Sequence, residues 1–330
     1  MIHTFKMYVP IHHSEVQNIQ RRFGITYNTV SEYFEGAYPG VSIVIINAGS
    51  GDWRLSFVVD AIKLLEKSNI TEADYPMLEQ ELKEIMFQIL GHSAYYKEHI
   101  LTRIDYRYDV VMANAAERHL LIALYRKLTR SHRHQKRYLG IAKKGEKFNA
   151  YETTVYHSSK STQAVVYLKD EEREAKGIEP EEHEKNVVRY EARVLNGHLN
   201  YMSKETTQNN RPKKLWAYLK EDIFIEYFTK YFSSIYHPCD FYKLDESRSI
   251  IRQSALSSSN KEKLINFLKS VSSFDLDTPL KTMTKSTRKR RLELLKELGI
   301  NPVSIPKNYP NAPSAMKNPL DKFPWKMNAK

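Results

Sequence analysis

The chain has 330 residues, of which 41% are hydrophobic, and a formal net charge of +12 at pH 7. A chain of this size and apolar content can bury a real core, and its positive charge favours a polyanionic partner. The single cysteine, Cys239, excludes an intramolecular disulfide and a thiolate-rich zinc site, as is typical of a reducing cytoplasm. With no signal-peptide core and no apolar run of membrane-spanning length, we expect a cytoplasmic protein of a bacterial cell that does not enter a membrane.

The first hundred residues alternate strand and helix patterns. Residues 1–9 and 41–49 read as strands, and residues 53–68 run from a strand into a helix. Residues 71–90 have the periodicity of an amphipathic helix, which begins at Thr71 as N-cap and ends at Gly91. This alternation is typical of an α+β protein.

A strand pattern at Thr102–Val111 gathers four charges. Successive side chains of a strand point to opposite faces, so Arg103, Asp105, Arg107 and Asp109 share one face. Four charges on one strand face predict either ion pairs or a site that needs carboxylates.

Two further strand patterns, Tyr151–Tyr156 and Thr162–Leu168, read as a hairpin, and the strand-like stretch of the second one runs on to Glu172. In the second one, Tyr167 and Lys169 share a face because they are two residues apart. Tyrosines in strands usually pack against neighbouring strands. A chemical role for Tyr156 or Tyr167 therefore depends on the charged residues around them.

The last strand pattern of this region is Asn186–Leu195. Its alternation places Arg189, Glu191 and Arg193 on one face. Carboxylates, basic groups and a phenol on adjacent strand faces suit metal-assisted attack on a phosphodiester. The alternative for Glu191 is a structural ion pair with one of the two arginines, and Asp105 has the same alternative with the arginines of its own strand.

Residues 170–184, between the hairpin and the last strand, are dense in acids. A solvated helix end and loop is the ordinary interpretation of such a run. The alternative is that Glu172, five residues after Tyr167, supports a site on the strands.

After residue 200 the patterns are helical. Residues 215–236 read as one aromatic-rich helix, whose rings we expect in the core rather than on a base-stacking platform, because their spacing is helical. Residues 260–271 read as a second helix. The last 70 residues hold 15 Lys and Arg against 6 Asp and Glu, a surplus of +9, so the positive charge of the chain is concentrated there.

The last helix pattern covers residues 284–299, with Ser286 as its cap and Gly299 as its end. Together with the preceding helix, and with residues 301–306 as a wing strand, it resembles a helix-turn-helix or winged-helix DNA reader. The alternative is an amphipathic packing helix with solvated arginines. The basic residues at its start are the candidate DNA contacts: Lys285, Arg288, Lys289, Arg290 and Arg291.

Three strand motifs follow one another in the order TRIDYRYDV, TTVYHSSKSTQAVVYLKDEEREAKG and NVVRYEARV. Over Leu101–Leu195 they resemble the core of plasmid and phage rolling-circle replication initiators, of the Rep_trans type and the related gene II/X-type phage replication proteins. Such initiators nick one DNA strand at an origin with a tyrosine, stay bound to the 5′ phosphate and later rejoin the strand. The resemblance implies an α+β fold: an antiparallel sheet nuclease core with flanking helices, plus a helical C-terminal region.

The resemblance also implies roles for the strand residues. Tyr167 matches the Tyr-x-Lys context of the family and is the favoured nucleophile, with Tyr156 as the alternative. Lys169 would support the tyrosine or the scissile phosphate, and Arg189 would clamp a non-scissile oxygen bidentately.

A divalent cation would suit this chemistry because the attacking oxygen meets a negatively charged phosphate. Mg²⁺ and Mn²⁺ prefer oxygen ligands, so Asp105 and Glu191 are the expected ligands, with Asp109 next.

We expect four regions. Residues 1–100 would be an α+β part that binds the origin or forms half of the core, and residues 101–200 the nicking and joining nuclease. Residues 201–300 would be helical, and residues 301–330 an extended or disordered tail. The partners are then origin DNA, duplex and single-stranded, with a host helicase and polymerase implied by the resemblance. A conjugative relaxase and a non-enzymatic DNA-binding regulator remain as alternatives, and the oligomeric state stays open.

Overall fold

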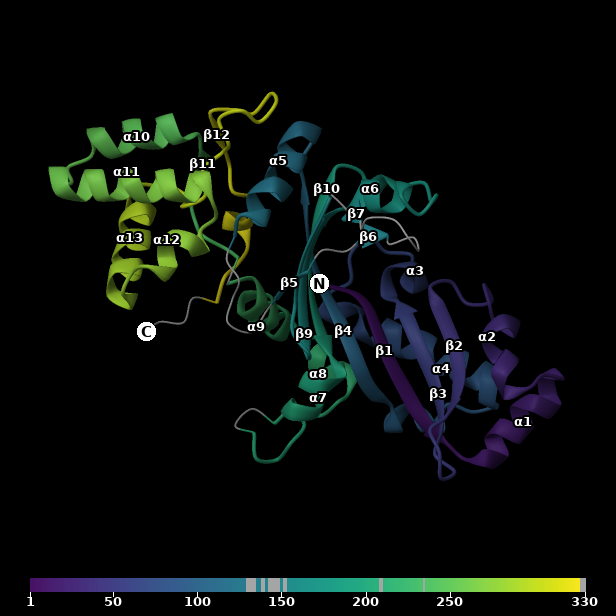
Figure 1. Ribbon diagram of the computed structural model, residues 1–330. Coiled ribbons are helices and arrows are strands. Elements are labelled where there is room, and N and C mark those ends of the chain that lie inside the picture. Colours follow the sequence, from purple (N-terminus) through teal and green to yellow (C-terminus); the bar gives the residue numbers. More distant parts are fainter. Residues whose placement is uncertain are drawn as a thin grey trace. The chain divides into compact units, whose positions relative to one another are not determined.

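An antiparallel sheet flanked by helices forms from the residues that the computed structural model describes, namely 1–128, 135–137, 140–141, 149–150, 153–207, 210–233 and 235–326 (Figure 1). The strand order is β2-β3-β1-β4-β10-β9-β8-β5. The strands are β1 (Ile2–Ile11), β2 (Val41–Asn47), β3 (Trp53–Asp60), β4 (Ile100–Val111), β5 (Gln135–Arg137), β8 (Thr154–Ser158), β9 (Thr162–Leu168) and β10 (Val187–Leu195). The mixed α+β class with a helical C-terminal region is confirmed.

The chain divides into two units, each made of separate stretches. The first unit holds Met1–Tyr108, Lys160–Gln163 and Glu191–Phe228, and the second holds Asp109–Ser159, Ala164–Tyr190 and Thr229–Lys330. Three strands, β4, β9 and β10, contribute residues to both units. The segment boundaries expected at residues 100, 200 and 300 stay predictions.

The core of the first unit is built from alternating apolar residues on β1 and β3. Phe5 pairs with Val59 and Met7 with Phe57 in the antiparallel register, and all four side chains are buried. The helical elements of this unit are α1 (His13–Phe23), η1 (Tyr27–Thr29), α2 (Val30–Tyr33), α3 (Ala61–Leu65), η2 (Glu72–Asp74), α4 (Tyr75–Leu90), η3 (Ala94–Glu98), α7 (Asn196–Met202) and α8 (Leu215–Tyr218).

The helix predicted at residues 71–90 is confirmed, with a different first turn. Thr71 forms a capping box with Asp74 at a short 3₁₀ turn, and α4 follows directly. Gly91 ends α4 in the left-handed region at φ 83°, a conformation that glycine adopts without strain.

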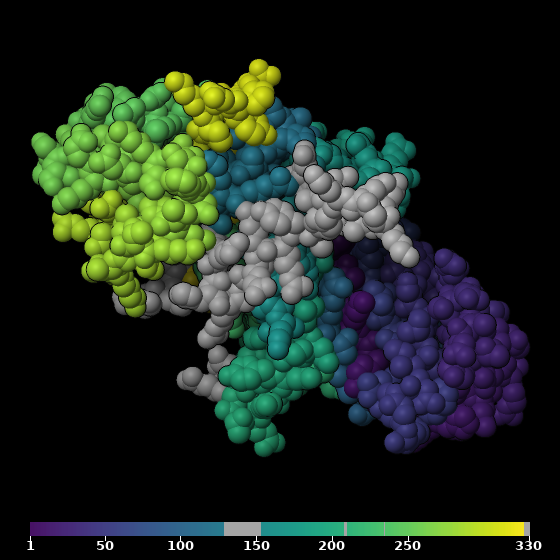
Figure 2. Space-filling view, viewed as in Figure 1, coloured from purple at the N-terminus to yellow at the C-terminus, as the bar shows by residue number. Residues whose placement is uncertain are grey.

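The second unit contains α5 (Ala115–Arg126), α6 (Lys169–Glu174), η4 (Glu182–Glu184), α10 (Leu244–Gln253), α11 (Ser258–Ser273), α12 (Asp277–Lys281), α13 (Lys285–Glu297) and η5 (Pro319–Lys322). It also contains the short strands β6 (Gly140–Ile141), β7 (Asn149–Ala150), β11 (Phe241–Tyr242) and β12 (Ala315–Met316). Helices α10 to α13 reach the surface on the face that Figure 2 shows, coloured green to yellow-green. The helix α9 (Glu221–Phe232) has residues in both units.

Two element predictions need correction. The hairpin strand predicted at Thr162–Leu168 is confirmed, but the strand-like stretch expected to run on to Glu172 ends there, because Lys169 begins α6. The single helix predicted at residues 215–236 is two helices, since α8 ends at Tyr218 and α9 begins at Glu221. The expected core role of the α9 aromatics is confirmed, as Tyr227, Phe228 and Phe232 are buried. Of the predicted strand Tyr151–Tyr156, residues 151 and 152 lie outside the described part of the chain.

The C-terminal tail contains turns, the short strand β12 and the 3₁₀ helix η5, and its apolar side chains are packed. Residues 301–306 form no wing strand, which corrects that prediction: Ile305 makes only an isolated bridge with Lys243. The apolar side chains of Val303, Leu320 and Phe323 are buried. Hydrophobic burial therefore holds this segment in place.

Candidate active site

Asp105 and Glu191 form a buried pair of carboxylates in the first unit. They lie on neighbouring strands, β4 and β10, and each is 1% exposed. Burial raises the pKa of Asp105 above its ordinary value, Arg103 opposes this, and the nearby Glu191 carboxylate adds to it. The sequence-based expectation that these two acids converge agrees with this geometry.

Two arginines neutralise this pair. Arg103 holds both oxygens of Asp105, with Nε 2.8 Å from Oδ1. Arg193 donates to Glu191 Oε2 from Nε at 3.0 Å and from Nη2 at 2.5 Å, and its Nε lies 3.9 Å from Asp105 Oδ2. Arg107, the other arginine considered for Asp105, donates to the backbone carbonyl of Ser68 instead. The four charges on adjacent strands thus form a compact ion-pair network.

His3 belongs to the same group and was missed by the sequence analysis. Its Nδ1 lies 3.2 Å from Glu191 Oε1, and its Nε2 lies 3.9 Å from Asp60 Oδ2. The β1–β4 register shifts between Ile2 and Thr4, so His3 occupies the irregular position of the strand. A histidine in line with the apolar alternate positions of the strand, Phe5, Met7 and Val9, was the available signal, but its partner is 188 residues away.

The donors at this site have the chemistry that a hard cation requires. Two carboxylates and an imidazole are ligand types that Mn²⁺ accepts, and the carboxylates also suit Mg²⁺. Among the residues that the structure describes, no group of three or more His, Cys, Asp or Glu is arranged as a metal centre. The carboxylate oxygens face arginine nitrogens, so a cation would take positions that the two guanidinium groups now hold.

Arg189 and Asp109 form a second ion pair, in the other unit. Arg189 is fully buried, and its Nε and Nη2 donate to the two Asp109 oxygens at 2.8 and 2.9 Å. This bidentate geometry is that of a strong structural pair. Arg189, the predicted phosphate clamp, and Asp109, the predicted third metal ligand, are therefore hydrogen-bonded to each other.

The two candidate nucleophiles lie in one cluster. Tyr156 on β8 and Tyr167 on β9 pack with Val165, and all three are buried. Cross-strand packing accounts for this placement without chemistry. The hydroxyl chemistry of either tyrosine stays a prediction.

Lys169 is placed differently from the expectation, because it starts α6 instead of extending the strand. Its Nζ lies 2.8 Å from Glu172 Oε2 and 3.4 Å from Glu184 Oε1, and Glu184 also accepts from Arg173 Nε at 2.7 Å. Burial opposes ionisation of Glu172, but the ammonium groups of Lys169 and Lys176 lower its pKa overall. Part of the acidic run at residues 170–184 is thus a buried ion-pair network, in which Glu172 accepts a hydrogen bond from Lys169.

The basic start of α13 contains two kinds of residue. Arg288 Nε donates to Met283 O at 3.0 Å, and Arg291 Nη1 donates to Lys263 O at 2.8 Å while lying over the Phe267 ring. These arginines help to pack the helix. Lys285, Lys289 and Arg290 are exposed. Three residues separate α12 from α13, which is the spacing of a helix-turn-helix.

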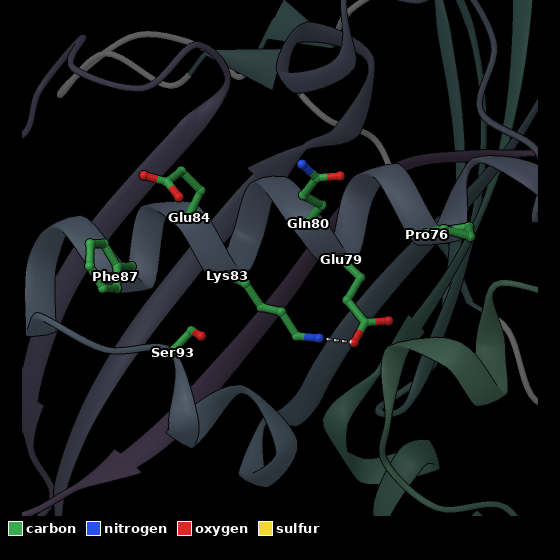
Figure 3. Close-up of a pocket in the computed structure, with 7 residues that line it drawn as sticks. All are labelled: Pro76, Glu79, Gln80, Lys83, Glu84, Phe87 and Ser93. Atoms are coloured by element: carbon green, nitrogen blue, oxygen red, sulfur yellow. Dashed lines mark ion pairs between the residues drawn. The ribbon is translucent and has the colours of Figure 1, made fainter.

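A pocket lies along α4, and the Lys83–Glu79 ion pair of 2.7 Å is part of its lining (Figure 3). Its lining consists of Pro76, Glu79, Gln80, Lys83, Glu84, Phe87 and Ser93. None of these is a residue for which the sequence predicts chemistry.

Comparison with known proteins gives a structural similarity alone. No family model and no curated protein matches the chain. A solved structure of a rolling circle replication initiator protein from Geobacillus stearothermophilus aligns over 93% of this chain and 98% of its own, with 9% identity and a TM-score of 0.31. Neither value assigns an activity to this chain. No helix within the described residues is both long enough and apolar enough to cross a membrane.

Proposed function

We propose that this protein initiates rolling-circle replication by nicking and rejoining one DNA strand. The observation that carries the proposal is the pair of buried carboxylates, Asp105 and Glu191, on adjacent strands. Both belong to the motifs that resemble the initiator core, and a non-catalytic fold gains little from two acids packed close enough for one to raise the pKa of the other.

The reaction is a transesterification. The hydroxyl oxygen of Tyr167, or of Tyr156, attacks phosphorus. The Tyr–O–P bond forms as the bond from phosphorus to the 3′ oxygen breaks, and the phenolic proton passes to the released 3′ oxygen, which becomes a hydroxyl. The phosphotyrosine ester keeps the energy of the broken bond, so the reverse attack rejoins the strand without ATP.

Asp105 and Glu191 would hold Mg²⁺ or Mn²⁺ through their carboxylate oxygens. When bound, such a cation neutralises phosphate oxygens and lowers the barrier to using a phenol whose ordinary pKa is about 10. His3 would orient Glu191 through its Nδ1 contact. Arg103 and Arg193 would balance the charge of the acids while no cation is bound.

Recognition of duplex DNA is proposed for the start of α13. The exposed residues Lys285, Lys289 and Arg290 follow the three-residue turn after α12, where a recognition helix meets phosphates and base edges. The host helicase and polymerase stay partners by resemblance alone. A relaxase acting at a transfer origin would use the same residues on a different DNA.

A second candidate function, a DNA-binding regulator without catalysis, is favoured by one observation. Each acid expected to bind metal is paired with an arginine: Asp105 with Arg103, Glu191 with Arg193, and Asp109 with Arg189. A purely structural role would give the same pairs.

The test uses supercoiled DNA that carries the replicon encoding the protein. The protein is incubated with this DNA and Mg²⁺ or Mn²⁺, and a covalent adduct is sought on a denaturing gel. We expect relaxed circles and an adduct that the Tyr156→Phe, Tyr167→Phe double variant does not form. DNA binding without an adduct under either metal would favour the regulator.

A further inference from the structure

Two large aromatic side chains of the first unit face solvent on the short helices α7 and α8. Tyr201 is 58% exposed and Trp216 is 48% exposed, whereas the adjacent side chains of Met202 and Leu215 are buried. The two helices therefore pack through their apolar residues and present one ring each outward. The α7–α8 segment lies at the surface in the green region at the bottom of Figure 2.

The two helices are tied to each other. Arg211 N donates to Met202 O at 2.9 Å, which brings the chain back beside the end of α7. Lys213 Nζ then donates to the side-chain oxygens of Asn196 and Asn200, both at 2.7 Å. The residues just before Trp216 thus lie alongside the helix that carries Tyr201.

The hydrogen bonds of Lys213 and Lys214 go to uncharged acceptors, and the acid nearest in effect is Glu98, which acts on Lys214. Lys213 is held by two neutral amides, and Lys214 Nζ by the backbone carbonyls of Lys97 at 2.6 Å and His99 at 2.9 Å. An ammonium has three N–H donors, so these bonds leave each lysine one donor for a phosphate oxygen. Burial and the charge of Arg54 lower the pKa of Lys213, and Arg54 is itself paired with Asp52.

Exposed rings beside fixed ammonium groups match the chemistry of single-stranded nucleic acid. Aromatic side chains stack on any base, while cations follow the phosphates, so binding needs no particular sequence. We propose that the helices α7 and α8, together with residues 213–214, bind single-stranded DNA, with Trp216 and Tyr201 stacking on bases and Lys213 and Lys214 contacting the backbone. The role of this surface in the cell rests on the proposed function, in which a strand is exposed at the origin.

The test measures binding of a labelled oligothymidylate of about 20 nucleotides, longer than single sites of about 4–16 nucleotides. Fluorescence anisotropy of the full chain without added metal gives the affinity. Trp216→Ala and Tyr201→Ala should each weaken binding about 5- to 150-fold, as expected for the loss of one stacked base. Trp216→Phe and Tyr201→Phe, which keep a ring, should bind nearly as the unmodified chain does.

Two further variants keep the test decisive. Phe87→Ala removes another exposed ring of the first unit, 54% exposed on α4, and should leave the affinity unchanged. Lys213→Gln should reduce the slope of log affinity against log salt by about 0.7, the value for one phosphate contact on a single strand. Unchanged oligothymidylate affinity in both alanine variants would overturn the inference, as would equal losses in the alanine variants and in Phe87→Ala.

Failure of this surface and failure of the proposed function give different results. If supercoiled DNA yields the covalent adduct but Trp216→Ala and Tyr201→Ala bind oligothymidylate normally, nicking stands and the surface does not. If no adduct forms but the alanine variants lose oligothymidylate binding, the surface stands alone.

Discussion

His3 Nδ1 lies 3.2 Å from Glu191 Oε1. This contact connects β1, the first strand in the chain, to β10, which in chain order is the last strand of the large sheet. The imidazole is partly buried, and its other nitrogen faces Asp60. A carboxylate held in this way keeps one orientation, which is what a metal ligand or a fixed ion pair requires. His3 therefore links β1 to the candidate site, as does the backbone pairing of Thr4 with Asp105 in the β1–β4 register.

The acid pair can be tested by amide substitution. Asp105→Asn and Glu191→Gln keep the shape of each side chain but remove its charge. Loss of a residue that only positions a metal ligand weakens metal binding about 10–100-fold, so loss of a ligand itself should weaken Mn²⁺ binding by at least that factor. Titration calorimetry measures the affinity, and the nicking rate follows separately. A variant that keeps the affinity and the rate across a metal titration would not be a ligand. His3→Gln serves as the comparison, with a smaller loss expected.

The nucleophile can be tested by removing one hydroxyl oxygen at a time. Tyr167→Phe should abolish the covalent adduct and leave duplex affinity unchanged, because only the phenolic oxygen is lost. Tyr156→Phe is the matched control, since both rings lie in the same buried cluster. An adduct in the Tyr167 variant that disappears in the Tyr156 variant would reverse the assignment.

The basic residues of α13 should separate into two classes. Arg288→Ala and Arg291→Ala should lower the melting temperature, because these guanidinium groups bond backbone carbonyls and one covers Phe267. Lys285→Gln, Lys289→Gln and Arg290→Gln should leave the melting temperature unchanged and weaken duplex binding, with the salt slope falling by about 0.9 per lost phosphate contact. Equal duplex affinity in the triple variant would make α13 a packing helix.

The Arg189–Asp109 pair should matter for folding. Asp109→Asn removes the carboxylate charge that faces a fully buried guanidinium, and breaking a buried pair from one side costs about 3–5 kcal/mol of unfolding free energy. Urea denaturation measures the loss. Should Asp109→Asn be as stable as the unmodified chain while nicking fails, the aspartate would have the chemical role that the sequence suggested.

Two histidines predict a pH dependence of stability. Burial lowers the pKa of His237 to about 4 and also lowers that of His99, whose Nε2 accepts from Leu215 N at 2.8 Å. In the unfolded chain the pKa of each imidazole is about 6.5. At a pH between the unfolded pKa and the lower folded pKa, the unfolded state binds more protons than the folded state does. The contribution of these histidines to the free energy of unfolding is therefore fully present above about pH 6.5 and is lost as the pH drops toward 4. Melting temperatures across this range should show a shallower fall in His237→Gln than in the unmodified chain.

The local elements could be predicted because their signals lie in neighbouring residues. The helix at residues 71–90, with its start at Thr71 and its end at Gly91, and the charged strand around Asp105 follow from periods of 3.6 and 2 that burial imposes. The charged faces of β4 and β10 could be read in the same way. Where two local patterns compete, prediction failed: Lys169 continues the strand alternation, yet it pairs with Glu172 one helical turn later and begins α6.

Only the tertiary structure decided which charges meet. The sequence allowed Asp105 to pair with Arg103 or Arg107 and Glu191 with Arg189 or Arg193. In the structure each acid pairs with an arginine two residues away on its own strand, Arg103 or Arg193, whereas Arg189 pairs with Asp109 on another strand. His3 and the exposed rings of Tyr201 and Trp216 acquired their surroundings in the same way. The physical reason is that periodicity says which face of an element is buried, whereas partners far apart in the chain are chosen by strand order and packing, which no local pattern encodes.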